Sequence, residues 1–147
     1  IGAYLSAYPQ VRYLFGAVSI SNEFPILAKH QIVACFQHHF QPLEHRAMAQ
    51  AKLPFRVDRG ILEGYRDMDY EESLAQLKIS LRKQNVVLPT LYKHYADLCE
   101  GDGTQFIDFN IDPKFSHCID GLMMVDLAFI KDKKRKRYLE PHTAPKH

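Results

Sequence analysis

Residues 106–126 read FIDFNIDPKFSHCIDGLMMVD, two apolar segments joined by a turn that contains proline. In the first segment, apolar residues such as Ile107 and Phe109 alternate with polar ones, which is typical of a strand with one apolar and one polar face. The polar positions are Asp108, Asn110 and Asp112. The second segment, GLMMV, is apolar throughout, as expected of an interior strand. Because proline cannot donate to a neighbouring strand, PKFSHC is predicted to form a wide hairpin turn.

A strand and a helix are expected upstream of this hairpin. Residues 11–21 are β-branched and aromatic and precede a turn signal, which indicates a strand. Apolar residues at helical spacing follow it, and Pro25 suits the first turn of that helix. Ser21 or Asn22 is the expected helix cap.

Two further helices are predicted between this helix and the hairpin. Asp69 and Glu72 resemble a capping box at the start of a helix with leucines on one face. Pro89 begins a short helix that ends at EGDG. Residues 41–68 show no clear period, and so long an irregular connection suggests a binding role. The order of elements predicts an α+β fold in which a mixed sheet is flanked by helices.

The bulk composition fits one globular domain and excludes some classes of protein. The chain has 147 residues, 46% of them hydrophobic, and its formal charge of +2 does not by itself suggest nucleic-acid binding. No apolar run approaches the roughly 18–20 residues of a membrane-spanning helix. The three scattered cysteines indicate reduced thiols and a cytoplasmic location. The first residue is Ile1 rather than methionine, so we expect a fragment of a longer chain.

Three windows of the sequence resemble one known family. YLFGAVSISNEFP (13–25), LPTLYKHY (88–95) and residues 106–126 together resemble the C-terminal half of the ornithine-lipid-synthase acyltransferases. These are GNAT-type N-acyltransferases, often described as hemolysin-like. Ala17 replaces a proline of the family pattern, and Phe24 stands where tyrosine is common.

The resemblance implies transfer of an acyl group from an acyl-carrier-protein thioester to the amine of a small amino acid such as ornithine, in bacterial membrane aminolipid synthesis. The co-substrate is the carrier's phosphopantetheine thioester, and no other cofactor is implied. Residues 1–140 would be the C-terminal portion of one acyltransferase domain, followed by a disordered tail at 141–147. The Q/R-x-x-G-x-G/A loop that cradles the donor's phosphate would precede Ile1, so this fragment alone is expected to be inactive.

Two alternative functions stay open. One is synthesis of an acyl-homoserine-lactone signal, which shares the fold and the donor. The other is a non-enzymatic, peripheral lipid-binding module that uses the basic residues near the C-terminus.

The resemblance places donor binding at the end of the first strand. Ser19, Ser21 and Asn22 are the candidates for pairing with pantetheine amides, which must exchange water for strand edges and side-chain amides. Helix capping by Ser21 or Asn22 is the structural alternative. Gly16 either permits close approach of a ligand or marks a bulge.

The polar face of the first hairpin strand is the candidate acceptor site. Asp108, Asn110 and Asp112 are predicted to hold the ammonium groups of the acceptor, and Asp108 is the candidate base for the attacking amine. The alternative is a solvated face on which Asp112 starts the turn. Glu23 is a second candidate base, or an acid at a helix N-terminus. Asp120 is expected to shape the return of the hairpin.

Two other groups of residues suggest binding. His38, His39 and His45 lie near Cys35, but no second ligand pair follows at a zinc-site spacing, so no metal is predicted. The run KDKKRKR contributes the candidate docking residues Lys133, Lys134, Arg135 and Lys136. Their partner would be the acidic carrier protein or the anionic inner face of the membrane, unless the run is simply a solvated helix end.

Overall fold

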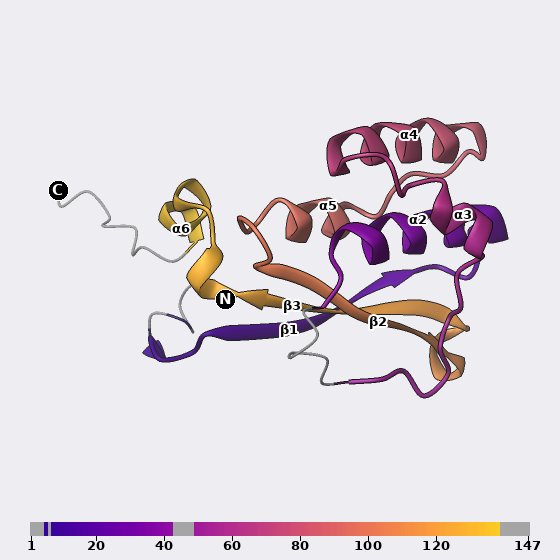
Figure 1. The fold of residues 1–147 in the computed structure, drawn as a ribbon. Coiled ribbons are helices and arrows are strands. Elements are labelled where there is room, and N and C mark those ends of the chain that lie inside the picture. The colour runs from indigo at the N-terminus through magenta and orange to yellow at the C-terminus, as the bar shows by residue number, and fades with distance from the viewer. Residues whose placement is uncertain (1–4, 6, 43–48, 139–147) are drawn as a thin grey trace, which may run out of the picture.

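The computed structural model of the protein describes residues 5, 7–42 and 49–138. Its α+β fold contains a three-stranded sheet in the order β1-β3-β2, and Figure 1 shows helices stacked over the sheet. The strands are β1 (Tyr13–Ile20), β2 (Thr104–Asp112) and β3 (Cys118–Asp126). Both pairings are antiparallel, so the α+β class is confirmed, whereas the predicted mixed sheet is not seen within the described residues.

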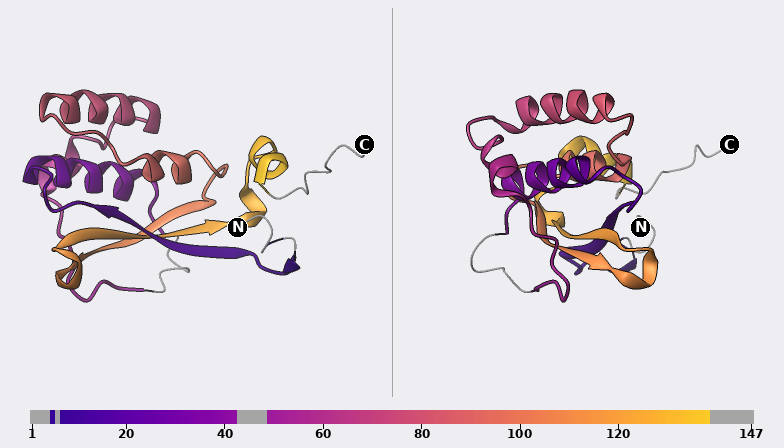
Figure 2. Two further views of the ribbon diagram at one scale, coloured as in Figure 1. Left: turned by 180° about the vertical axis from the view of Figure 1, so that it is seen from behind. Right: turned by 90° about the vertical axis from the view of Figure 1, so that its right-hand side faces the viewer.

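The helices form two layers above one face of the sheet. They are α2 (Ile26–His39), α3 (Arg59–Glu63), α4 (Tyr70–Lys83), α5 (Thr90–Ala96) and α6 (Asp132–Tyr138). In Figures 1 and 2, α2 and α5 lie next to the sheet and α4 lies on the far side of α2. The short helix α6 follows β3 at the end of the sheet away from α3. None of the helices α2 to α6 covers the other face of the sheet.

Tyr92 of α5 joins the helices to all three strands. Its ring stacks on Phe106 of β2, with centroids 5.4 Å apart, and lies 4.9 Å from the ring of Phe36 of α2. Its buried hydroxyl donates a hydrogen bond of 3.1 Å to the carbonyl oxygen of Val18 in β1. The absence of a side chain at Gly121 of β3 leaves room for it, because a Cβ there would be 3.2 Å from the tyrosine oxygen.

The alternation predicted for β2 is correct in its second half and wrong at its start. Asp108, Asn110 and Asp112 share one face, because they pair in turn with every second residue of β3. An irregularity between Phe106 and Asp108 shifts the register. As a result Phe106, rather than the expected Ile107, is buried against the helices.

The predicted start of α4 is confirmed, and the predicted cap of α2 is wrong. Asp69 is the N-cap of α4, where its Oδ1 accepts the backbone N–H of Glu72 at 2.8 Å. Helix α2 begins after Pro25, which is itself in the N-cap position, and has no side-chain cap. Ser21 instead closes a turn, in which its Oγ accepts the N–H of Glu23 at 3.1 Å.

The two irregular segments have different structures. The hairpin turn contains a short 3-10 helix, Pro113–Phe115, followed by left-handed backbone at Ser116 and His117, as suits the predicted wide turn. The connection 41–68 contains α3 and a stretch that pairs with the outer edge of β2. Residues 43–48 of this connection lie outside the described residues, as does the predicted disordered tail 141–147.

The candidate histidines belong to the end of α2. His39 Nε2 lies 2.7 Å from Ser73 Oγ of α4, and His45 lies outside the described residues. Cys35 is buried, which raises the pKa of its thiol to about 12. In the part of the chain that the structure describes, no three His, Cys, Asp or Glu side chains gather closely enough to hold a metal ion.

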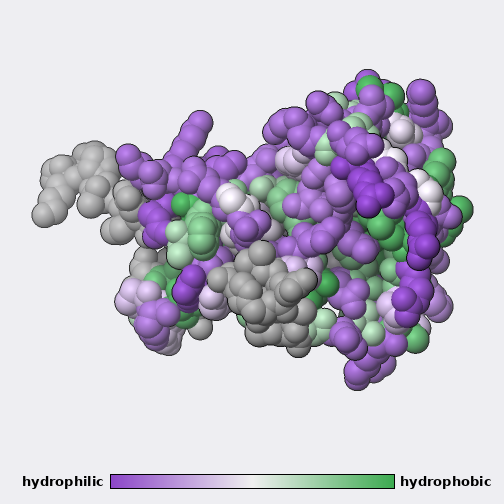
Figure 3. Space-filling model, in the orientation of Figure 1, coloured by the Kyte–Doolittle hydropathy of each residue, from purple (hydrophilic) through white to green (hydrophobic). Residues whose placement is uncertain are grey.

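The surface in Figure 3 is mostly hydrophilic, with hydrophobic residues in smaller patches between the polar ones. Among the described residues, no helix combines the length and the apolar character needed to cross a membrane. The three cysteines are free, as their spacing predicted.

Replacing Gly121 by alanine is expected to destabilise the fold. The new Cβ would lie 2.8 Å from Phe109 Cε1 and close to Tyr92, so a packed core must shift. We expect a loss of about 1–3 kcal/mol in the free energy of unfolding, measured in urea. Gly16→Ala is the matched control, because its Cβ would make an ordinary 3.7 Å contact with Met123. Equal destabilisation by the two substitutions would contradict this packing.

Acidification is expected to weaken the contact between α2 and α4. Burial, and secondarily the charge of His38, lower the pKa of His39 from its usual 6.5. The folded state therefore binds this proton less readily than the unfolded state, so stability is full above pH 6.5 and falls as the pH drops towards the folded pKa. Urea unfolding across this range should show a shallower pH dependence in His39→Gln than in the parent protein. The same pH dependence in both proteins is the contrary result.

Candidate functional site

A polar row crosses all three strands on the helix-free face of the sheet. Ser19 of β1 is paired with Asp120 of β3, and Asp120 is paired with Asn110 of β2. Cys118 and Asp112 form the next pair towards the hairpin turn. Neighbouring positions along each strand point the other way, and these include the buried residues Val18, Ile20, Ile119 and Phe109. We call Ser19, Asp120, Asn110, Asp112 and Cys118 the polar row.

Asp120 is the centre of the polar row. Its Oδ1 accepts a 2.6 Å hydrogen bond from Ser19 Oγ and a 3.5 Å contact from Cys118 Sγ. Desolvation, together with the hydrogen bond and negative charge of Asp120, raises the pKa of the Cys118 thiol. The carboxylate, hydroxyl and amide groups of the polar row can bind cations and hydrogen-bond donors.

Asp108 and Asn110 fasten a neighbouring segment to the sheet. The Oδ2 atom of Asp108 accepts the N–H of Ala51 at 2.7 Å, while its Oδ1 accepts its neighbour's N–H, that of Phe109, at 2.9 Å. The side-chain oxygen of Asn110 accepts the N–H of Leu53 at 2.9 Å. Both carboxylate oxygens of Asp108, the candidate base, are therefore engaged with the backbone.

The other predicted residues lie in the turn between β1 and α2. Asn22 Oδ1 accepts a 2.5 Å hydrogen bond from the ammonium group of Lys29, a residue only 8% exposed. Ser21 and Glu23 are exposed and are linked by the turn hydrogen bond described above. The structure thus brings Ser19, Asn110 and Asp112 into the polar row, and places Ser21, Asn22 and Glu23 in the turn that follows β1.

The two outer edges of the sheet differ. Along β2, the N–H of Phe55 donates to Phe109 O at 2.9 Å and the N–H of Ile111 donates to Leu53 O at 2.8 Å. No strand among the described residues pairs with the outer edge of β1. This eight-residue strand has no proline and no charged side chain, and Phe15 is 53% exposed. Such an edge is a template for an extended partner.

The basic residues of α6 lie far from the polar row. Arg135 donates from Nη2 to the carbonyl oxygen of Leu127 at 2.7 Å, and Lys134 is also partly covered, while Lys133 and Lys136 are exposed. Strand β3 begins at the polar row and ends just before α6, and nine residues of strand span roughly 25 Å. The predicted docking residues and the predicted acceptor residues therefore occupy opposite ends of the sheet.

Asp120 is the residue of the polar row that the sequence did not single out as a binding residue. It is expected to shape the return of the hairpin, and it lies within the returning strand β3, where it contacts Ser19 and Cys118. The period of two could have revealed it, because Asp120 and Leu122 share a face once the start of the strand is fixed.

No protein-family model matches the chain, and no curated protein or solved structure matches it. The functional interpretation therefore depends on the geometry of the polar row and of the β1 edge, together with the chemistry of their side chains.

Replacing Asp108 by alanine is expected to release the segment around Ala51 from β2. The substitution leaves two backbone N–H groups without their acceptor. Amide hydrogen exchange at Ala51 and Phe109 should accelerate about tenfold, which corresponds to about 1.4 kcal/mol. Asp112→Ala, four residues further along the same strand face, is the control and should leave exchange at Ala51 unchanged. Unchanged exchange at Ala51 in Asp108→Ala would contradict this fastening role.

Proposed function

We propose that the chain is the C-terminal portion of a GNAT-type N-acyltransferase. The complete enzyme transfers an acyl group from an acyl-carrier-protein thioester to the amine of a small cationic amino acid such as ornithine, and so makes a membrane aminolipid. The observation that carries the proposal is the outer edge of β1, which pairs with no other strand in the described part of the chain and runs alongside a polar row on the same sheet. Two of the three sequence windows that resemble the family, 13–25 and 106–126, cover β1, β3 and most of β2, which form this arrangement, and the third, 88–95, falls on α5.

The β1 edge suits the donor. A pantetheine arm carries amide groups along an extended chain, and an unpaired strand offers alternating N–H and C=O groups at matching spacing. Asn22 adds a side-chain amide just beyond the strand, held in place by Lys29. The β1 edge and the Asn22 amide would replace the hydrogen bonds to water that the donor loses on binding. Such replacement is required if these hydrogen bonds are to contribute to the free energy of binding.

The polar row suits the acceptor. Asp120 and Asp112 supply negative charge for its ammonium groups, and Ser19 and Asn110 supply neutral polar atoms beside them. In the reaction, the amine nitrogen attacks the thioester carbonyl carbon, the carbon–sulfur bond breaks, and the proton lost by the amine is returned to the leaving thiolate. Asp120 replaces Asp108 as the carboxylate that we assign to the acceptor, because both oxygens of Asp108 hold backbone groups. Glu23 is the second candidate base.

Helix α6 suits an acidic partner. Its exposed Lys133 and Lys136 would attract the carrier protein electrostatically and orient it, chiefly at low salt. A carrier bound there must deliver its thioester along the length of the sheet, because α6 and the polar row lie at opposite ends of β3. We place the enzyme in the cytoplasm at the inner face of the membrane.

The cations of α6 also favour a second candidate, a non-enzymatic module on an anionic membrane surface. The coding sequence upstream of Ile1 distinguishes the two functions. A Q/R-x-x-G-x-G/A loop between a strand and a helix supports the enzyme, and its absence supports the membrane module.

The proposed activity is tested by expressing the complete gene in a host that lacks such lipids and recording the lipid extract by mass spectrometry. We expect a new acylated amino-acid lipid. Normal expression of folded protein without any such lipid would contradict the synthase proposal.

Asp120→Asn and Asp112→Asn are expected to raise the KM for the acceptor about tenfold each, because a charge-assisted contact to an ammonium group is lost. The KM for the donor should stay unchanged. Asp58→Asn is the matched control, since Asp58 caps α3 by accepting the N–H of Ile61 at 3.0 Å. Steady-state kinetics with the complete enzyme measure these values, and an unchanged acceptor KM in both variants would remove the polar row from the acceptor site.

A further inference from the structure

A groove between α4 and α5 forms a second surface suited to ligand binding. It has a volume of about 470 Å³ and lies on the helical side of the molecule, away from the polar row. Its apolar part comes from Leu81 of α4 and from Val86, Val87 and Leu88 in the connection that follows. Leu81 and Leu88 are buried, whereas Val87 is 82% exposed. An apolar side chain so open to water gains most from a ligand that covers it.

Local structure explains why the apolar residues gather there. Asn85 has left-handed backbone, with φ of 59°, and ends α4 with a sharp turn. The N–H of Val86 then donates to the carbonyl oxygen of Leu81 at 3.1 Å. The chain therefore returns beside α4 before Pro89 starts α5, and residues 86–88 form one side of the groove.

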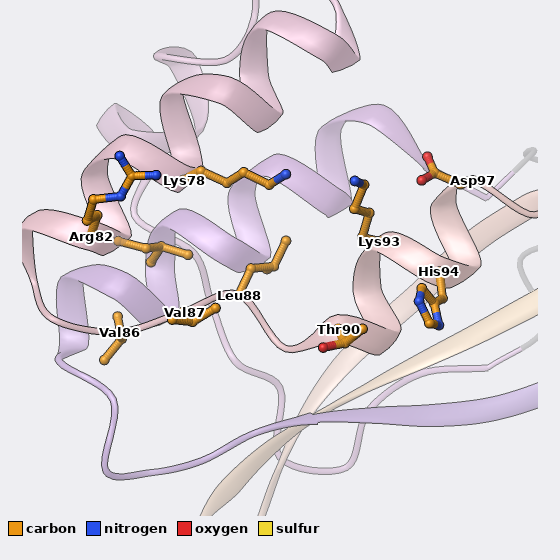
Figure 4. Close-up of a pocket in the computed structure, with 10 residues that line it drawn as sticks. Lys78, Arg82, Val86, Val87, Leu88, Thr90, Lys93, His94 and Asp97 are labelled. Carbon is orange, nitrogen blue, oxygen red and sulfur yellow. The ribbon is translucent and has the colours of Figure 1, made fainter.

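The rim of the groove is basic. Lys78 and Arg82 lie one turn apart on α4, and Lys93 and His94 come from α5. Figure 4 shows the ammonium groups of Lys78 and Lys93 pointing towards one another from the two helices. Asp97, at the end of α5, is the single acid among the residues that line this groove. The positive charges of Lys78 and Lys93 repel each other, and an anion bound between them would be attracted to both.

We propose that this groove binds a single-chain amphipathic anion, meaning an acyl or alkyl chain with a carboxylate or phosphate head. The head lies between Lys78 and Lys93, and the chain lies along Val86, Val87 and Leu88. The volume falls within the range of small-molecule sites, about 300–1,000 Å³. The ligand is a free monomer rather than a lipid in a bilayer. A concave groove between two helices can enclose one chain, whereas a flat membrane surface would contact only the helices on either side of it. This site is independent of the proposed acyl-transfer reaction.

The test is calorimetric titration of the purified protein with three twelve-carbon probes, each below its micelle-forming concentration. The probes are dodecanoate, dodecyl phosphate and dodecyltrimethylammonium. We expect both anions to bind with one-to-one stoichiometry and the cation to bind at least about tenfold more weakly, because it meets the basic rim. Octanoate should bind more weakly than dodecanoate, since it covers less of the apolar side.

Two variants locate the site. Lys78→Gln/Lys93→Gln removes the facing charges, and Val87→Asp places a carboxylate on the apolar side. Each should weaken dodecanoate binding about tenfold or more. Lys52→Gln/Lys114→Gln removes the same charge from exposed positions outside the groove and should leave the affinity unchanged. Circular dichroism and thermal unfolding check that each variant is folded. Lys78, Lys93 and Val87 are exposed, so we expect both variants to fold.

Three outcomes would overturn the proposal. The first is equal binding of the anionic and cationic probes. The second is unchanged dodecanoate affinity in the folded Lys78→Gln/Lys93→Gln variant. The third is retention on anionic phospholipid vesicles that depends on Lys78 and Lys93 while the monomeric anions do not bind, which would assign the groove to a membrane surface.

Discussion

The contact between Tyr92 and Gly121 holds helix α5 against the sheet. Tyr92 donates its buried hydroxyl proton to β1, stacks on an aromatic ring of β2 and lies above the bare backbone of β3. A Cβ at Gly121 would lie 2.8 Å from Phe109 Cε1 and 3.2 Å from the Tyr92 oxygen, so this packing would have to shift. The helices cover the face that carries the buried apolar residues, and the polar side chains of all three strands lie together on the other face. The polar row and the exposed edge of β1 both depend on this packing.

Much of this arrangement could be predicted from local patterns, because strand alternation and helix caps act over short distances. The shared face of Asp108, Asn110 and Asp112 and the cap at Asp69 are examples. The start of β2 could not be predicted, because an irregularity at Ile107 changes which side chains face the core. The contact of Asp120 with Ser19 could not be predicted either, because it depends on the register of β3 against β1, a strand about 100 residues earlier. The pairing of residues 53–55 with β2 joins segments far apart in sequence, which periodicity cannot reveal.

The acidic residues of β2 and β3 have different partners in the structure. Asp108 accepts backbone N–H groups, and Asp112 begins the hairpin turn by accepting the N–H of Lys114 at 3.0 Å. Asp126 pairs with Arg12 at 3.2 Å. Asp120 is bound to two side chains of the polar row, Ser19 and Cys118. An acid in a strand is therefore a weak signal of function until its partners are known, and this difference moves the proposed acceptor contact from Asp108 to Asp120.

The central functional claim is that the outer edge of β1 receives the extended arm of an acyl donor. Amide hydrogen exchange of β1 in the complete protein, with and without a non-hydrolysable acyl-pantetheine analogue, tests it most directly. We predict slower exchange at the β1 amides that point away from β3, with no change in those that pair with β3. Binding of the analogue with unchanged exchange throughout β1, or an outer edge already protected before it is added, would contradict the claim.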